Sequence, residues 1–248
     1  MDTMRPIALE QMKAVRLMNR IDQKYMAATY LLPELLQQVA DHYYVQRIDG
    51  VALAPYHTLY FDTPSLDMYV AHHNQKLNRL KLRVRRYRST DTTFFELKQK
   101  DNKKHTHKTR ISVDATQFDH CLQLPEVQQF VATNTPFSIS TLQPQVENHF
   151  ERITLVNNQM TERITIDTDI TFHNHTTNID ANINHLMVIE VKHEVGTPTS
   201  AIEHALHQLH ILPRRMSKYC IGTAITYPNI KHNRFKPKLL YIDKLALI

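Results

Sequence analysis

Residues 79–88 read RLKLRVRRYR and alternate basic side chains with Leu and Val. On a β-strand, side chains two positions apart point to the same face. This stretch therefore predicts a strand with a basic face at Lys81, Arg83 and Arg85 and an apolar face behind it.

Six further stretches repeat this pattern, which makes it the property of a whole sheet. They are Arg20-Asp22-Lys24, Glu96-Lys98-Lys100, Lys108-Arg110, Arg152-Thr154, Arg163-Asp167-Asp169 and Glu190-Lys192. We expect strands at 19–26, 43–48, 56–62, 79–88, 93–100, 107–113, 146–156, 161–172 and 186–194, most of them joined by connections that suit antiparallel neighbours. Helices are expected at 31–42, 65–73 (with Thr63 as N-cap), 126–133, 197–210 and 217–226.

A sheet with eight or nine strands tends to close on itself. The predicted fold class is α+β, with a closed or nearly closed antiparallel β-barrel of about eight strands and helices packed outside. No repeat or linker interrupts the 248 residues. We therefore expect a single domain over 1–248, with its core at about 15–225 and a basic tail at 228–248.

The composition excludes several classes of protein. Only three glycines occur, and both a Walker A loop and a dinucleotide fingerprint need clustered glycines to bring backbone N–H groups onto phosphates. The two cysteines show no metal-ligand spacing, which suits a reducing compartment. With no apolar run long enough for a signal peptide or a membrane span, we expect a cytoplasmic protein without a membrane segment.

In a closed barrel the charged faces would line the lumen. Each buried, unpaired charge costs several kcal/mol, so such a lumen must be wet and hold anions. The alternative is an open sheet whose charged face meets solvent. The net charge of +6 favours polyanionic partners only weakly.

Nucleic acid is not the partner that we expect. Sheets that bind RNA place aromatic residues on the exposed face, whereas Tyr87 and Phe94 are expected to flank the charged faces or to lie opposite them. Carboxylates also interrupt the cations, which favours a metal-assisted phosphate site. The His-x-His pairs at 105–107 and 173–175 are expected to be incidental, and His72 and His73 to be a solvated pair at a helix end.

Seven motifs together resemble a known family. They are Arg20-Ile-Asp22-Gln-Lys24-Tyr25, Leu82-Arg83-Val-Arg85-Arg86-Tyr87, Phe95-Glu96-Leu-Lys98, Lys108-Thr-Arg110, Glu162-Arg163-Ile-Thr-Ile-Asp167-Thr-Asp169, Ile189-Glu190-Val-Lys192 and Met216-Ser217-Lys218-Tyr219. In this order, over about residues 15–225, they resemble the VTC domain. That domain is the polyphosphate-polymerase branch of the triphosphate tunnel metalloenzymes (the CYTH-like superfamily), here in its short, stand-alone bacterial form.

The resemblance implies an eight-stranded tunnel and transfer of the γ-phosphate of ATP to a growing polyphosphate chain, assisted by Mn²⁺ or Mg²⁺. It implies that the triphosphate is held by Arg83, Arg85, Lys98, Arg152 and Arg163. Further phosphate ligands would be Lys24, Lys108, Arg110, Lys192, Arg215 and Lys218. Glu190 would bind the metal, and the remaining acidic residues would orient the cations or add metal ligands: Asp22, Glu96, Asp167 and Asp169.

The chain departs from the superfamily pattern at two positions. Hydrolytic members begin with an ExExK-type strand, whereas this chain has Arg20-x-Asp22-x-Lys24, which favours a polymerase over a triphosphatase. Arg215 stands where a Lys is expected. A metal-dependent triphosphatase and a non-catalytic polyphosphate or nucleotide sensor remain as alternatives, and the oligomeric state is open.

Overall fold

A single large sheet organises the chain. The computed structural model describes residues 4–14, 20–103, 105–194 and 196–247, except the side chains of residues 13, 14 and 20. Along the sheet the strands follow the order β2 (Arg20–Ala28), β11 (Leu186–Glu194), β9 (Glu162–Asn174), β8 (Gln143–Asn157), β4 (Ala54–Asp62), β5 (Arg79–Tyr87), β6 (Thr92–Lys100) and β7 (Thr106–Val113). Each neighbouring pair is antiparallel, as predicted.

The sheet is not a closed barrel. Its order ends at β2 and β7, and within the described residues no backbone hydrogen bonds join these two strands. Two short strands that the sequence did not predict extend it: β1 (Arg5–Ala8) pairs in parallel with β3 (Tyr43–Arg47), and β10 (Ile179–Asn182) pairs with β9. The α+β class with a large antiparallel sheet is confirmed, and closure by hydrogen bonds is not.

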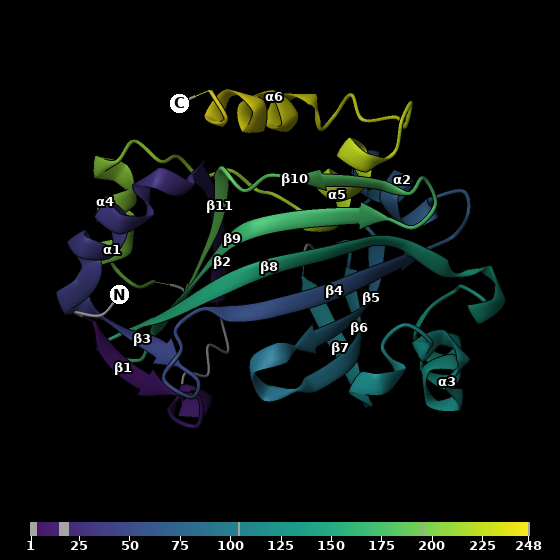
Figure 1. The fold of residues 1–248 in the computed structure, drawn as a ribbon, viewed down its shortest axis with the longest axis horizontal. Helices are drawn as coiled ribbons and strands as arrows, with labels where there is room; N and C mark the ends of the chain where they lie inside the picture. The colour runs from purple at the N-terminus through teal and green to yellow at the C-terminus, as the bar shows by residue number, and fades with distance from the viewer. Residues whose placement is uncertain (1–3, 15–19, 104, 195, 248) are drawn as a thin grey trace.

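Helices cover the apolar outer face of the sheet (Figure 1). At one end, α1 (Leu32–Val39) and α4 (Ala201–Gln208) pack on Ile166 and Ile189, which are fully buried. At the other end, α3 (Pro125–Asn134) covers β6, where Phe130 contacts Phe95 edge-to-face at 5.8 Å between ring centroids. The apolar sides of the alternating strands thus face helices, as their spacing predicts.

Three more helices gather near β9 and β10: α2 (Asp67–His73), α5 (Lys218–Thr226) and α6 (Lys236–Leu245) (Figure 1). Gly222 of α5 lies directly against Phe172 of β9, because a Cβ there would come within 2.7 Å of the ring atom Cε1. The hydroxyl of Tyr241 in α6 donates to the carbonyl of Met26 at 3.1 Å. None of the described helices is long and apolar enough to cross a membrane.

The start of α2 differs from the prediction. Thr63 was expected to cap a helix beginning at Ser65, but α2 begins at Asp67. The hydroxyl of Thr63 does accept a hydrogen bond from the N–H group of Asp67 at 3.1 Å. The carboxylate of the fully buried Asp62, one residue earlier, accepts hydrogen bonds from the N–H groups of Met68 and Tyr69, each at 2.9 Å, and so satisfies further free N–H groups of this helix.

A β-bulge in β9 changes which residues face the inside of the sheet. Arg152 of β8 pairs with Asp167, but His149 pairs with Thr171, so β9 carries one extra residue at this point. Asp169 there has a φ of 51°. Because side chains alternate along a strand, the extra residue turns Asp169 out to solvent. The prediction that Asp169 shares a face with Asp167 is wrong for this reason.

Candidate functional site

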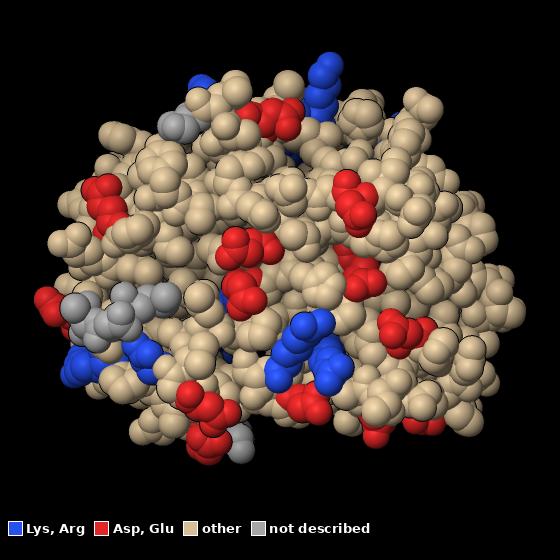
Figure 2. Space-filling view, in the orientation of Figure 1, with Lys and Arg blue, Asp and Glu red and all other residues tan. Residues whose placement is uncertain are grey.

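One face of the sheet carries the charged residues of seven strands. We call this face the basic wall. By register it comprises Lys24, Glu190, Lys192, Arg163, Thr165, Asp167, Arg152, Tyr56, Thr58, Tyr60, Lys81, Arg83, Arg85, Phe94, Glu96, Lys98, Lys108 and Arg110. On the molecular face shown in Figure 2, by contrast, Lys and Arg are few and Asp and Glu are scattered among uncharged residues.

The sheet curls, so that distant strands face one another across the basic wall. Lys98 of β6 lies close enough to Lys24 of β2 and Glu190 of β11 for their charges to act on its pKa, although five strands separate β2 from β6 in the sheet. Helix α5 also bridges the wall, because Lys218 contacts Asp167 of β9 while Ser217 accepts a hydrogen bond from Lys81 of β5 at 2.8 Å. The basic wall is therefore concave.

Three carboxylates of the basic wall each bind two cations. We call these groups the ion triads: Glu190 with Lys24 and Lys192, Glu96 with Arg83 and Lys108, and Asp167 with Arg152 and Lys218. Nζ of Lys24 lies 2.5 Å from Oε1 of Glu190, and the two nitrogens of Arg152 that face Asp167 lie 2.6 and 2.8 Å from its oxygens.

The carboxylates of the ion triads stay ionised. Burial alone would raise their pKa values, but the paired cations outweigh it: Arg83 and its neighbours lower the pKa of Glu96 to about 2. In the same way, Arg152 and Lys218 hold the pKa of Asp167 below its usual range, and Lys24 and Lys192 do so for Glu190. With two cations on one carboxylate, each ion triad keeps a net positive charge.

Two more cations of the basic wall have no carboxylate partner among the described residues. Arg85 is buried, donates to the hydroxyl of Thr58 at 2.9 Å, and has its guanidinium 5.5 Å from the ring centroid of Phe150. Lys81 donates to Ser217. Burial lowers the pKa of both side chains, which shows that their positive charge is poorly compensated by the protein itself.

Three lysines have a pKa close to neutrality. Desolvation lowers the pKa of Lys98, Lys108 and Lys218 to about 8 in each case. The charge of Lys81 adds to the effect at Lys98, whereas Glu96 and Asp167 oppose it at Lys108 and Lys218. Lys98 and Lys108 lie toward solvent, and Lys218 is nearly buried, with 11% of its side chain exposed.

The basic wall also contains aromatic residues, contrary to the prediction. Phe94 lies on it, with the guanidinium of Arg110 4.1 Å from its ring centroid. Nζ of Lys218 lies 4.1 Å above Phe150. The sequence contained the signal, because Phe94 lies two residues before Glu96 on the same strand. Aromatic faces attract cations and hold these side chains in place.

Four wall residues were missed as site residues: Thr58, Tyr60, Lys81 and Ser217. Tyr60 is buried at 5% exposure. Burial would raise its pKa, but the charges of Arg83, Arg85 and Lys81 lower it to about 8. Spacing two from Arg83 placed Lys81 on the basic face, but Lys81 was not included among the predicted phosphate ligands. Ser217 comes from the N-cap of α5 and could not be placed from the strands.

Two further predicted site residues, Arg215 and Asp22, lie at the edge of the wall or outside it. Arg215 is exposed in the segment before α5 and makes no hydrogen bond or ion pair in the described part of the chain. Its neighbour Arg214 contacts the site instead, since its N–H donates to the carbonyl of Lys24 at 2.7 Å. Asp22 is exposed opposite Lys192, and the side chain of Arg20 lies outside the described residues.

His72 and His73 are not the solvated pair expected from the sequence. His73 is 1% exposed and contacts the ring of Phe235 edge-to-face, with 5.5 Å between centroids. His72 lies near the basic wall, where burial and the charge of Lys81 lower its pKa to about 2. It therefore remains neutral and adds no charge.

The surroundings of Glu190 suit a divalent cation. Across the β11–β9 pair, Glu190 lies opposite Thr165, whose buried hydroxyl oxygen has no hydrogen-bond partner among the described residues. A carboxylate beside an unpartnered hydroxyl offers hard oxygen donors, and Mg²⁺ or Mn²⁺ at phosphate sites commonly uses one or two carboxylates together with substrate oxygens. The donor set fits such an ion.

Residues 19–227 match the profile of the VTC domain. The chain belongs to the VTC-domain family. The predicted relationship is thereby confirmed, and the matched range contains every predicted site residue, from Asp22 to Lys218. No curated protein matches the chain.

Two solved structures resemble this VTC domain in fold. A candidate adenylate cyclase from Bacillus halodurans is 17% identical, with a TM-score of 0.50 over 80% of this chain and 94% of that one. A candidate adenylyl cyclase from Hippeastrum, described as having a dominant triphosphatase activity, is 14% identical. Its TM-score is 0.51 over 85% of this chain and 98% of the other. At this identity the similarity shows the fold alone.

Proposed function

We propose that this VTC domain is an ATP-dependent polyphosphate polymerase that transfers the γ-phosphate of ATP to a growing polyphosphate chain. The observation that carries the proposal is the concave basic wall, where every carboxylate of the ion triads is shared by two cations. A linear polyanion is the ligand that offsets such an excess of charge along several strands.

The wall offers two kinds of phosphate contact. Arg83, Arg85, Arg152 and Arg163 supply planar guanidinium groups, which can bind phosphate oxygens through two hydrogen bonds, and the lysines act as point charges. Bound phosphates would raise the pKa of Lys98, Lys108 and Lys218 above its present value of about 8, since a nearby anion favours the charged form.

Transfer to phosphate fits the site better than hydrolysis. Hydrolysis by a general base needs a carboxylate able to accept a proton from water, yet the paired cations lower the pKa of Glu96, Asp167 and Glu190. The terminal phosphate of a polyphosphate chain is already anionic and needs no strong base. The protein then contributes positioning and charge neutralisation, which supply most of the catalysis in phosphoryl transfer.

A divalent metal belongs to the proposal. Glu190, with Thr165 beside it, would hold Mn²⁺ or Mg²⁺, which when bound supplies charge neutralisation at the phosphate oxygens. Lys24 and Lys192 form ion pairs with the carboxylate of Glu190. With a metal ion bound to that carboxylate, these two lysines would pair with phosphate oxygens instead.

We extend the proposal to the whole chain and to its setting. Residues 1–248 would act as one domain, because α6 packs on the sheet through Tyr241 and the buried Ile242. A cytoplasmic setting is consistent with Cys121 and Cys220, which are free and buried, and it would supply ATP.

The test is to incubate the purified protein with ATP and Mn²⁺ and to resolve the products by gel electrophoresis and phosphate release. We expect long polyphosphate chains, and we expect Arg83→Ala and Glu190→Gln to abolish their formation while the proteins stay folded. Arg86→Ala is the matched control, because Arg86 lies on the same strand but faces outward and pairs with Asp91 at 2.7 Å.

The alternatives give different products. Free phosphate without chains would identify a triphosphatase, the activity described for the Hippeastrum protein. Tight triphosphate binding without turnover in Mn²⁺ or Mg²⁺ would identify a sensor. Either result would overturn the polymerase proposal. Full metal-dependent activity in Glu190→Gln would overturn the assignment of Glu190 as the metal ligand.

A further inference from the structure

A second cluster of charged and imidazole groups lies away from the basic wall. It surrounds Glu147 of β8. Nε2 of His57 and of His149 lie 2.5 and 2.9 Å from its Oε1, and Nε2 of His175 lies 3.0 Å from its Oε2. These histidines come from β4, β8 and the residue that follows β9, so three segments far apart in sequence meet at one carboxylate.

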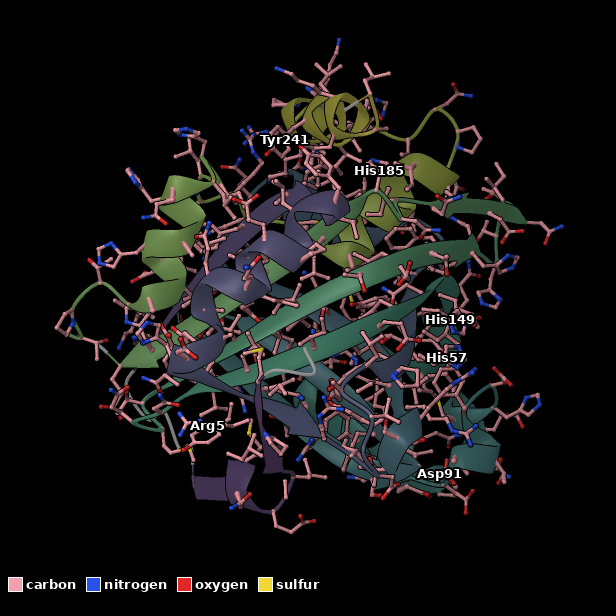
Figure 3. All side chains as sticks on the ribbon, turned by 60° about the vertical axis from the view of Figure 1, so that its left-hand side comes forward. Arg5, His57, Asp91, His149, His185 and Tyr241 are labelled. Atoms are coloured by element: carbon pink, nitrogen blue, oxygen red, sulfur yellow. The ribbon has the colours of Figure 1, made fainter. Side chains whose placement is uncertain are left out.

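The cluster is on the outer face of the sheet. Thr58 and Asn148 face the basic wall, and their neighbours His57, Glu147 and His149 therefore point to the opposite side. Figure 3 shows His57 and His149 side by side at this end of the strands. Their side chains are 13% and 44% exposed, so one side of the cluster is open to solvent and an ion can enter.

The donor atoms are those that zinc prefers. Imidazole nitrogen and carboxylate oxygen are its usual ligands, at about 2.0–2.2 Å in a tetrahedron. The ligand atoms of His57, Glu147 and His149 all lie within 4.8 Å of one another. In a tetrahedron with bonds of about 2.0 Å, neighbouring ligand atoms are roughly 3.3 Å apart. Small side-chain movements would therefore bring these three residues into a coordination shell, and His175, which lies on the other oxygen of Glu147, would complete it by a larger movement.

Packing holds the imidazole rings in orientation. The ring of His57 stacks on His149 with 4.2 Å between centroids, and on its other side lies Phe118 at 4.0 Å. Arg86 lies opposite His57 in register, and Asp91 binds its charge.

His175 has support of its own. Its ring contacts His173 edge-to-face, with 4.9 Å between centroids, and Nδ1 of His173 lies 2.9 Å from Oδ1 of Asp180. This contact helps to hold the ring of His175 in its orientation toward Glu147. The His-x-His pair at 173–175, expected to be incidental, thus takes part in a cluster that its sequence spacing did not reveal.

We propose that His57, Glu147, His149 and His175 bind a Zn²⁺-class transition metal ion that ties β4, β8 and the end of β9 together. The site is structural. It lies across the sheet from the basic wall, and its imidazole nitrogen donors differ from the oxygen donors around Glu190. An ion there would stiffen the two strands that carry Thr58, Tyr60 and Arg152 on their inner side.

The test uses the full-length protein, stripped of metal with a chelator and titrated with Co²⁺. We expect one equivalent of Co²⁺ to bind with the visible absorption bands of a tetrahedral site, and Zn²⁺ to displace it. Replacing a ligand should weaken Co²⁺ binding about 100-fold or more, since even indirect partners of metal ligands contribute 10–100-fold. His149→Asn and His175→Asn are the first variants, because both side chains are partly exposed and their loss should leave the fold intact.

Two controls separate this site from others. His107→Asn alters the second group that could hold an ion, Asp101, His105 and His107, which is mostly exposed. Glu190→Gln alters the oxygen site of the basic wall. Both variants should keep the visible absorption bands of tetrahedral Co²⁺ that the unmodified protein shows. Absence of tetrahedral Co²⁺ binding, or binding that survives His149→Asn and disappears in either control, would overturn the proposal without affecting the proposed polymerase activity.

Discussion

Lys218→Met should make the ligand-free protein more stable and its binding of triphosphate weaker. The pKa of Lys218 falls from 10.5 to about 8, and one pKa unit corresponds to about 1.4 kcal/mol. Holding this side chain charged therefore costs the fold about 3 kcal/mol near neutral pH. Met has a similar shape and no charge, and Asp167 keeps both hydrogen bonds from Arg152, at 2.6 and 2.8 Å.

The expected gain is smaller than this limit, at about 1–2 kcal/mol, because even an uncharged amine at this position would donate a hydrogen bond to Asp167, and Met cannot. For a chain of this size, 1 kcal/mol shifts the melting temperature by about 2–4 °C. Thermal unfolding without ligand should therefore show a rise of about 2–8 °C. Lys244→Met, at an exposed position on α6, is the control and should change stability by less than about 0.5 kcal/mol.

The pH dependence provides an internal check on this reasoning. Between about pH 8 and 10.5 the unfolded chain binds a proton at Lys218 that the folded chain does not bind. The stability of the unmodified protein therefore rises with pH through this window. The advantage of Lys218→Met should shrink over the same range. A variant that is less stable than the unmodified protein near neutral pH, or that binds triphosphate equally well, would refute the argument.

Three further predictions concern the basic wall and its end. Triphosphate affinity should fall as pH rises above about 8, because the three wall lysines with that pKa lose their charge; calorimetric titrations from pH 7 to 9 measure this, and a flat profile would contradict it. Asp167→Asn should weaken triphosphate binding by releasing its two cations, whereas Asp169→Asn, on the outer side of the bulge, should leave binding unchanged. Gly222→Ala should destabilise the protein by about 1–3 kcal/mol, because its Cβ would lie 2.7 Å from a ring atom of Phe172; denaturant unfolding tests this, and an unchanged midpoint would show that the ring yields freely.

The sequence predicts the basic wall well where alternation is unbroken. β5 and β6 are nine-residue strands without a bulge, so spacing alone places Arg83, Arg85, Glu96 and Lys98 on one face. The same spacing fails at Asp169, since nothing in a run of Thr, Asp and Ile reveals an inserted residue with a positive φ. Periodicity predicts which way side chains face only in a regular strand, whereas the position of a bulge depends on how the strand pairs with its neighbour.

Residue spacing within a strand could not predict contacts between segments that are far apart in the sequence. Glu147 and its three histidines are not a sequence motif, because β4, β8 and the end of β9 supply them separately. The pairing of Lys81 with Ser217 depends on where α5 enters the sheet. Whether the sheet closes was also undetermined, since strand number favours a barrel while the hydrogen bonding between β2 and β7 depends on the curvature of the whole sheet.

The bulge in β9 reverses which side of the sheet each of the following residues faces. Before it, from Arg163 to Asp167, the strand presents charge to the inside, over a length of about 13 Å at 3.3 Å per residue. After it, Ile170 and Phe172 take the inner positions and form the apolar surface on which Gly222 of α5 rests. A single inserted residue thus determines where the charged part of β9 ends and where the apolar contact with α5 begins. Moving that insertion by two positions would change the length of this charged stretch by about 7 Å without altering any charged residue.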